Sequence, residues 1–208
     1  DVHHGDGVEA AFYDTDQVLS ISLHQHGHTL FPGTGFPEEM GEGPGRGYSV
    51  NVPLAPETDD DLYLSVFTEV VPPLVQAYNP DVVVTQLGVD TMSTDPLASL
   101  SLSVDGFGRV VEEIKSWNFK WVALGGGGYA IMNVARAWTK AWAIMKGVQL
   151  SDNLPESFVD LHQSELGENP TLSDPSHKTH PVIAGRAQAL AKAVVERIKE
   201  SIFPIIGA

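Results

Sequence analysis

Two short apolar segments that run directly into glycine constrain the fold of this chain most strongly. The first covers residues 81–87 and leads to Gly88, and the second covers residues 121–124 and leads to four consecutive glycines. Such segments are typical of β-strands that are covered on both faces. Helical periodicity and helix start signals occupy the stretches before, between and after them, at residues 58–78, 103–117, 131–146 and 183–202. Strands that alternate with helices predict an α/β fold with a mostly parallel sheet.

The rest of the chain fits one domain of this class. We expect a short helix at residues 7–14 and strands at residues 18–23 and 48–54. Residues 24–47 are rich in Gly and Pro and predict a long loop, a feature that is usually functional in a compact domain. Residues 148–182 are expected to be irregular. Because no linker or internal repeat interrupts the sequence, residues 1–208 are expected to form part of one domain.

Composition narrows the possible functions. The chain has 12 Lys and Arg against 27 Asp and Glu, which gives a net charge of −15, and it contains no cysteine. This charge argues against direct binding of nucleic acid, which requires cationic side chains to neutralise phosphates. No stretch of about 18 apolar residues is present, so no membrane-spanning segment is expected. Without cysteine, any metal ion must be held by His, Asp and Glu.

Polar side chains follow three of the expected strands. Asp90 lies just past the first apolar segment, Tyr129 lies just past the second, and Asp1 and His3 are expected at the end of a strand that begins upstream. The carboxyl ends of parallel strands meet at one edge of a sheet, where ligands bind. The sequence therefore predicts a functional site that combines these residues.

Asp1, His3 and Asp90 suit a metal ion. Residues i and i+2 of extended backbone point to the same side, so Asp1 and His3 can bind one ion while His4 points away. Asp90 would complete a set of three ligands with an open position, which is the pattern of catalytic zinc sites. Taken singly, Asp1 and His3 also fit a solvated strand end, and Asp90 also fits a turn.

The glycine run at residues 125–128 admits two interpretations. With Ala130 it matches a dinucleotide-binding fingerprint, for which Asp152 lies at a suitable distance. Alternatively, the glycines let backbone and substrate approach closely and present Tyr129, whose hydroxyl can donate to a developing oxyanion. The remaining histidines are expected to be structural or solvated; they are His24, His26, His28, His162, His177 and His180.

Five motifs in order along the chain resemble the histone deacetylase superfamily. They are Asp-Val-His-His-Gly-Asp-Gly at residues 1–7, Phe-Pro-Gly-Thr-Gly at 31–35, Tyr-Ser-Val-Asn-Val-Pro at 48–53, Gln-Leu-Gly-Val-Asp at 86–90 and Gly-Gly-Gly-Gly-Tyr at 125–129. The chain is most similar to the prokaryotic deacetylase-like and acetoin-utilisation members. The resemblance implies the arginase/deacetylase fold, a three-layer αβα arrangement with a mostly parallel sheet. It also implies a zinc-dependent amidohydrolase that removes acetyl groups from acetyl-lysine or a related acylated amine by means of metal-activated water.

The resemblance also implies roles for individual residues. Asp1, His3 and Asp90 match the zinc ligands, Tyr129 matches a catalytic hydrogen-bond donor, and Asp6 matches the carboxylate that orients one of the catalytic histidines. The substrate channel is matched by Phe31, Leu97, Gly127 and Gly128. One structural site for a monovalent cation, usually potassium, is matched around Asp1, His3, Ser22 and Leu23, and a second site is matched by Phe12, Thr15, Val18 and Tyr48.

Two departures from the family pattern lead to further expectations. The family's paired catalytic histidines lie upstream of these motifs, and residues 1–208 do not include them. We therefore expect the chain to be the C-terminal portion of a single deacetylase domain whose N-terminal part is missing, and to be inactive alone. Met92 stands where the arginase-like relatives have a further metal-binding aspartate, so one ion is expected rather than two.

Two alternatives stay open at this level. One is an acetylpolyamine amidohydrolase, although polyamine-specific relatives can have a glutamate where this chain has Leu97. The other is a non-catalytic nucleotide-binding α/β domain. For the deacetylase interpretation, the expected partners are acetylated lysine or a small acetylated amine, without nucleic acid or membrane, and the expected location is the cytoplasm.

Overall fold

The computed structural model describes residues 1–166, 170–174 and 177–208, and it has the predicted α/β character. The strands are β1 (Ser20–Gln25), β2 (Ser49–Leu54), β3 (Val82–Gln86) and β4 (Lys120–Leu124). They form two parallel pairs, β1 with β2 and β3 with β4. All four lie within two residues of the segments that the sequence indicated.

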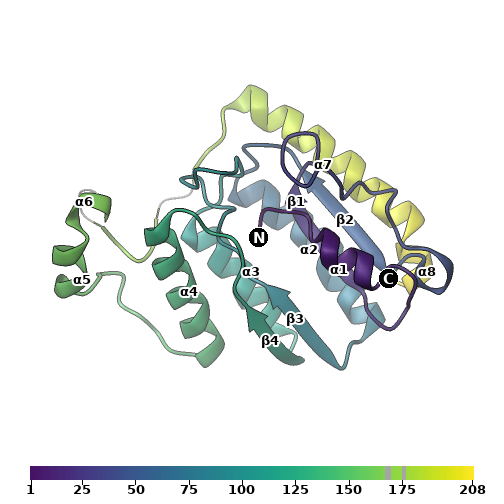
Figure 1. Cartoon of the computed structure of the whole chain (residues 1–208), viewed down its shortest axis with the longest axis horizontal. Helices are drawn as coiled ribbons and strands as arrows, with labels where there is room; N and C mark the ends of the chain where they lie inside the picture. The colour runs from purple at the N-terminus through teal and green to yellow at the C-terminus, as the bar shows by residue number, and fades with distance from the viewer. Residues whose placement is uncertain (167–169, 175–176) are drawn as a thin grey trace.

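Helices connect and cover these strands. The structure contains α1 (Asp6–Ala11), α2 (Asp60–Tyr78), α3 (Val104–Ser116), α4 (Ile131–Lys146), α5 (Glu156–Leu161), α6 (Gln163–Leu166), α7 (Pro181–Ser201) and α8 (Phe203–Ile206), with a 3₁₀ turn η1 at Gly43–Gly45. Side-chain caps begin α2 and α3, which lead into β3 and β4: Asp59 accepts a hydrogen bond from the Leu62 amide, and Ser103 accepts one from the Gly106 amide. The expectation that residues 148–182 are irregular was wrong in part, since α5 and α6 form there. They lie away from the strands (Figure 1).

The first residues of the chain join the two strand pairs. The Gln25 amide at the end of β1 donates to the Val2 carbonyl at 2.9 Å, and the Asp1 nitrogen donates to the Gly88 carbonyl, just past β3, at 3.1 Å. Val2 itself is fully buried in the main hydrophobic cluster. The carboxyl ends of β1 and β3 are therefore fixed at a common edge, with Asp1 and His3 between them.

The long helices pack against one side of the strands. Val50, Val52 and Leu54 of β2 pack with apolar residues of α2 and α7, while Trp121 and Ala123 of β4 pack with α3 and α4. On the opposite side of β1 and β2 lie α1 and the loop that joins the two strands, and the buried strand residues there are polar. Figure 1 shows α1 in front of β1 and β2, with α2 behind the strands.

One face of the β3–β4 pair is exposed, contrary to expectation. The outward side chains of Val82, Val84, Val122 and Leu124 are 44%, 61%, 47% and 51% exposed. Burial alternates along both strands, because only the inward side chains meet the helices. The prediction of two covered faces was wrong for the described residues, since apolar composition reports β-propensity and not the presence of a covering layer.

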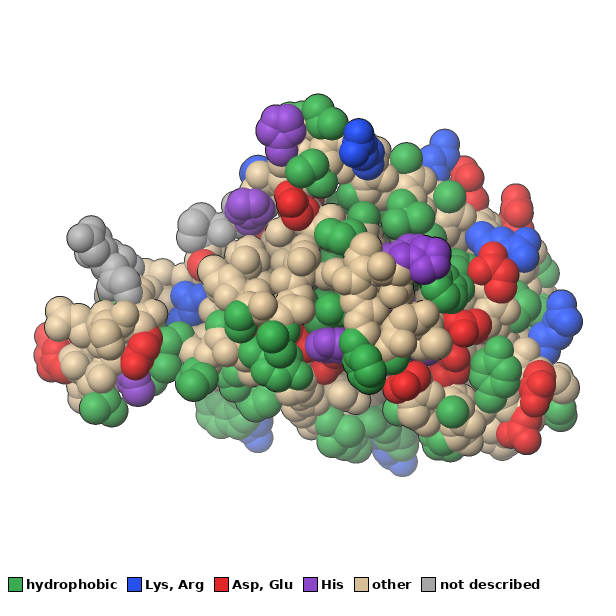
Figure 2. Space-filling view, turned by 45° about the horizontal axis from the view of Figure 1, so that its top comes forward, with side chains coloured by type: hydrophobic (Ala, Val, Ile, Leu, Met, Phe, Trp, Pro, Cys, Tyr) green, Lys and Arg blue, Asp and Glu red, His purple; other side chains and the backbone are tan. Residues whose placement is uncertain are grey.

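No helix in the described part of the chain combines the length and apolarity needed to cross a bilayer. Charged side chains gather at the end of the molecule near α8 and the C-terminus (Figure 2). The centre of the same face carries mainly hydrophobic and uncharged side chains together with histidine.

Candidate metal centre

Three potential ligands converge where residues 1–3 meet the end of β3. One donor atom each from Asp1, His3 and Asp90 lies within 4.8 Å of the other two. The His3 Nδ1 atom is 3.2 Å from an Asp1 carboxylate oxygen and 3.0 Å from an Asp90 oxygen. The Asp90 side chain is fully buried, whereas the side chains of Asp1 and His3 are 16% and 24% exposed. The expected sharing of one side by residues 1 and 3 is thus present, and the cluster can be reached from solvent.

Backbone amides hold both carboxylates. The Val2 amide donates to Asp90 at 2.7 Å, the His3 amide donates to Asp1 Oδ1 at 2.9 Å, and the Gly127 amide donates to Asp1 Oδ2 at 2.6 Å. Groups that hold ligands from behind fix the direction in which the ligands point. The glycine run after β4 is therefore part of the centre, although it supplies no ligand itself.

The glycines are required because the carboxylates pass so close. A Cβ atom at Gly127 would lie 1.9 Å from Asp90 Oδ2, and one at Gly126 would lie 2.7 Å from the Gly88 backbone. The space next to the glycine run is thus taken by two carboxylates, which would repel a pyrophosphate. This arrangement disfavours the dinucleotide interpretation, and Asp152 instead accepts a hydrogen bond from the Ser173 amide at 2.8 Å.

The predicted channel residues lie on exposed segments. The side chains of Phe31, Leu97 and Tyr129 are 77%, 57% and 49% exposed. A residue that sequence reasoning missed connects two of them: Asp95 accepts hydrogen bonds from the Leu97 amide at 2.9 Å and from the Tyr129 amide at 2.8 Å. Gly128 adopts a φ of +157° beside Val89, which places Tyr129 next to the loop after β3.

A buried polar network lies between α1, β2 and the loop that carries Phe31. His4 points away from the metal cluster, with Nδ1 2.9 Å from Thr34 Oγ1 and Nε2 3.3 Å from a Glu9 oxygen. Glu9 also accepts hydrogen bonds from Ser49 and Asn51. Burial raises the pKa of Glu9, but the hydrogen bonds from His4, Asn51 and Ser49 outweigh it and lower the pKa below its ordinary value. The network ties the residues after the cluster to the Phe31 loop.

His24 belongs to the same region and is fully buried. Its Nε2 lies 2.9 Å from the Gly35 carbonyl and its Nδ1 lies 2.9 Å from Ser22 Oγ. Burial lowers the pKa of His24 to about 4, so the ring is neutral near pH 7. The expectation of a structural role for His24 agrees with this packing.

The other histidines lie outside the cluster. The rings of His26 and His28 are in tilted contact with their centroids 4.9 Å apart, His162 contacts Glu165, and His180 accepts a hydrogen bond from the Val182 amide at the start of α7. His177 is exposed.

The remaining predicted site residues surround α1 and the start of β1. Asp6 is exposed and its carboxylate accepts a hydrogen bond from the Gly7 amide at 2.8 Å. The residues matched to monovalent cations lie in the α1–β1 connection, in β1 and just before β2; they are Phe12, Thr15, Val18, Ser22, Leu23 and Tyr48. The Tyr48 carbonyl accepts from the Ser20 amide at 2.9 Å, and the Phe12 carbonyl accepts from the Thr15 amide at 3.4 Å. The roles of these residues stay predictions.

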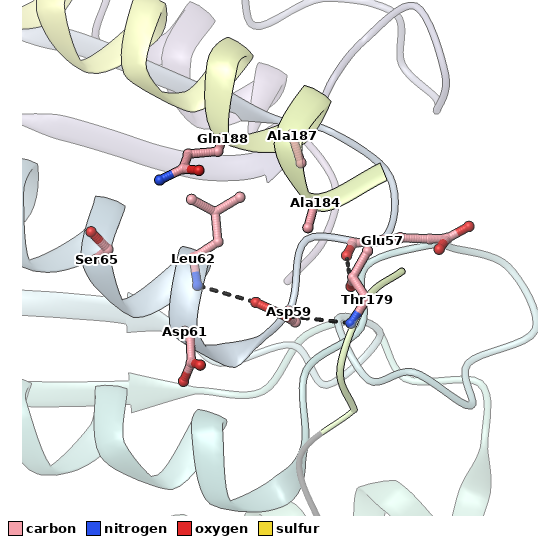
Figure 3. A pocket seen from close by; sticks show the side chains of 9 residues that line it. All are labelled: Glu57, Asp59, Asp61, Leu62, Ser65, Thr179, Ala184, Ala187 and Gln188. Atoms are coloured by element: carbon pink, nitrogen blue, oxygen red, sulfur yellow. Dashed lines mark hydrogen bonds between the residues drawn. The ribbon is translucent and has the colours of Figure 1, made fainter. Parts of the chain in front are cut away.

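A separate cavity of about 320 Å³ lies between the start of α2 and α7 (Figure 3). Two of its acidic side chains already have partners. Asp59 accepts hydrogen bonds from the amides of Leu62 and Thr179, and Asp61 pairs with Lys178. We therefore assign these carboxylates to the attachment of α7 rather than to a ligand.

Comparisons with known proteins agree on one family. The family described as "Histone deacetylase domain" matches residues 1–145. Histone deacetylase HDAC1 of Drosophila melanogaster is 43% identical over 155 residues, which are 74% of this chain and 30% of that protein. Histone deacetylase clr6 of Schizosaccharomyces pombe is 44% identical over 155 residues, which are 74% of this chain and 38% of that protein. The chain thus spans about a third of the length of these curated relatives.

Solved structures match over almost the whole chain. A crystal structure described as an HDAC homolog complexed with SAHA has a TM-score of 0.86 and 33% identity, and the match covers 96% of this chain and 55% of that one. An HDAC homolog from Aquifex aeolicus has a TM-score of 0.83 and 33% identity, with the same coverage of both chains. The expected arginase/deacetylase fold is therefore confirmed, while placement in a prokaryotic subgroup stays a prediction.

Proposed function

Because the chain belongs to the histone deacetylase family, we propose that it carries the metal centre of a zinc-dependent amidohydrolase that removes acetyl groups from acetyl-lysine or a related acylated amine. The observation that carries this proposal is the convergence of Asp1, His3 and Asp90 within 4.8 Å at the edge where the parallel strands end. The Gly127 amide, in the glycine run after β4, supports the cluster by donating a hydrogen bond to the Asp1 carboxylate.

The donor set favours one divalent ion. Two carboxylates so close together repel each other unless a cation lies between them. Two carboxylate donors and one imidazole donor suit zinc, and no cysteine is available in the chain. Met92, which is 1% exposed in an apolar cluster, offers no oxygen for a second ion. Bound there, zinc would supply Lewis-acid polarisation of an amide carbonyl and lower the pKa of water.

The residues of the chain would then orient and stabilise the reacting amide. The Tyr129 hydroxyl can donate a hydrogen bond to the oxyanion that develops from the carbonyl. The exposed side chains of Phe31 and Leu97 can enclose the methylene stem of an acylated amine. Polyamine-specific relatives can have a glutamate at the position of Leu97. Because Leu97 carries no charge, acetyl-lysine is favoured over an acetylated polyamine. The negative net charge favours the approach of a substrate that carries further cationic groups, such as the remaining amines of an acetylated polyamine.

Proton transfer needs a general base, and we propose that the 208 residues do not supply it. His3 is assigned to the metal, His4 is held between Glu9 and Thr34, and His24 is buried. The other histidines lie outside the cluster. We propose that Asp6 instead orients a catalytic histidine that is not among these residues. Potassium at the two matched sites would act as a structural ion.

The metal proposal is tested by binding. We expect the chain to bind one zinc per molecule and, when loaded with zinc, to bind an acyl-hydroxamate analogue of acetyl-lysine. Asp90→Asn removes one of three ligands and should weaken zinc binding by more than about 100-fold. Asp60→Asn is the matched control, because Asp60 is also buried but contacts Ser103 at the start of α3. Titration with a competing chelator and elemental analysis measure both variants, and unchanged zinc affinity in Asp90→Asn would refute the ligand assignment.

A separate assay tests the acid–base proposal. The zinc-loaded 208-residue chain should hydrolyse a fluorogenic acetyl-lysine substrate and an acetylated polyamine no faster than the Tyr129→Phe variant does. Without a positioned base, about 10²–10⁴-fold of the rate is lost. If the chain instead turns over substrate at rates typical of enzymes and Tyr129→Phe abolishes this turnover, a base is present among residues 1–208. NAD should not bind, and saturable NAD binding would favour the nucleotide-binding alternative.

A further inference from the structure

We propose that Asp95 is a positioning residue, which holds Tyr129 and Leu97 in one fixed arrangement beside the metal centre. This inference rests on the proposed function for the role of Tyr129. Asp95 lies in the connection between β3 and α3, five residues after Asp90, and it is 7% exposed. A carboxylate so deeply buried requires hydrogen bonds to offset its lost hydration.

Both carboxylate oxygens of Asp95 are used, each by a different segment. Oδ1 accepts from the Leu97 amide at 2.9 Å, within its own loop, and Oδ2 accepts from the Tyr129 amide at 2.8 Å, after the glycine run. An ionised carboxylate is an acceptor only, and hydrogen bonds to a charged acceptor are stronger than neutral ones. The side chain therefore joins the two segments that carry the predicted oxyanion donor and the predicted rim residue.

Two further contacts hold the same segments together on either side of Tyr129. The Val89 amide donates to the Gly127 carbonyl at 2.7 Å, and Asn133 Nδ2 donates to Thr94 Oγ1 at 2.8 Å. These contacts fix the glycine run at Gly127 and the first turn of α4. The Asp95 contact is the one that acts on the Tyr129 backbone itself.

Positioning matters here because the Tyr129 side chain is half exposed. Packing alone therefore fixes the direction of its hydroxyl only in part, and the position of the backbone decides where the hydroxyl can reach. A shift of about 1 Å in a group that acts on a reacting atom can cost about 100-fold in rate. Asp95 is thus inferred to set the geometry of Tyr129 without touching the substrate.

The first test is independent of any substrate. Asn has one acceptor oxygen and one donor group, so Asp95→Asn can keep at most one of the two amide contacts. Hydrogen exchange at the Tyr129 or Leu97 amide, measured by NMR, should therefore become faster by on the order of tenfold. Asp60→Asn is the control, since Asp60 is a buried carboxylate that accepts from the amide and hydroxyl of Ser103. This control should leave exchange at both amides unchanged.

The second test measures coupling to Tyr129. In the zinc-loaded chain, Asp95→Asn should weaken binding of the acyl-hydroxamate about tenfold while zinc affinity changes less than about threefold. The double variant with Tyr129→Phe should bind no more weakly than the weaker single variant, because both changes remove the same interaction. A purely structural role for Asp95 would instead give multiplicative losses.

The outcomes separate this inference from the proposed function. Unchanged exchange at both amides, or multiplicative losses in the double variant, overturns the role of Asp95. A wild-type chain that binds zinc but no hydroxamate overturns the proposed function, and the exchange measurement then decides whether Asp95 holds the two segments. If Asp95→Asn does not fold, Asp95→Glu replaces it. Glu keeps the charge and displaces both oxygens, so faster exchange at the same amides is expected.

Discussion

A neutral histidine that is fully buried makes the stability of a protein depend on pH. His24 has no exposed surface, and burial lowers its pKa from 6.5 to about 4. Hydrogen bonds to the carbonyls of Gly35 and Ser22 and the charge of Glu9 raise the pKa, while His4 lowers it, but burial has the largest effect. In the unfolded chain the same ring binds a proton near pH 6.5.

The direction of the pH effect follows from proton binding. Between pH 6.5 and 4 the unfolded chain binds more protons at His24 than the folded chain does, so acid favours unfolding. We expect the contribution of His24 to be complete above pH 6.5 and to fall by about 3 kcal/mol as the pH reaches 4. The lowered pKa of Glu9 adds a loss only at more acidic pH, below its ordinary value of 4.5.

Urea unfolding at several pH values measures how the free energy of unfolding changes with pH, which is the slope compared below. His24→Gln cannot take up the proton, so the free energy of unfolding should be lower at pH 7.5 but flatter between pH 6.5 and 4.5. His177→Gln changes an exposed ring and should keep the slope of the wild type. An identical slope in His24→Gln and the wild type would show that another group is responsible.

At the scale of single residues, the sequence predicted the geometry of the cluster well. Asp1 and His3 are two positions apart, and the period of extended backbone is enough to place them on one side. Asp95 could not be found in this way, because its partners at residues 97 and 129 are brought together only by the parallel pairing of β3 and β4. An acid before proline in a loop is a common turn signal and indicates no particular contact.

At the scale of elements, local sequence signals were sufficient to predict where helices and strands occur. Helix α2 begins after Asp59 and α3 begins after Ser103, where side-chain caps satisfy free amides. Helix α4 ends at Gly147, which adopts the left-handed conformation with a φ of +68° that glycine allows. These interactions involve residues close in sequence, so a reader of the sequence can anticipate them.

The contacts between elements that are distant in the sequence could not be predicted in this way. Residues 1–3 join β1 to β3 through contacts with Gln25 and Gly88, which are distant in the sequence. The glycine run illustrates the same limit, because its match to a dinucleotide fingerprint is a local property. Only the folded chain shows that Gly127 has no Cβ because Asp90 occupies that space.

At the scale of the whole molecule, the fold class is the predicted one, but the described residues leave one face of β3 and β4 uncovered. Val84 and Val122 are paired neighbours on this face and are 61% and 47% exposed. Val83, the next residue along β3, points the other way and packs against α2 and α3. Contiguous apolar surface of this kind is rare on monomeric proteins and binds hydrophobic molecules.

We expect the 208-residue chain to bind a fluorescent hydrophobic dye through this face. The double variant Val84→Thr and Val122→Thr keeps β-branched residues in both strands, so dye fluorescence should fall clearly while the free energy of unfolding changes by less than about 1 kcal/mol. Val83→Thr is the matched control, because it places a hydroxyl in the packed layer. This variant should lower the free energy of unfolding by about 1–3 kcal/mol and leave the dye signal of the folded chain unchanged. Dye binding that survives the double variant would locate the apolar surface elsewhere.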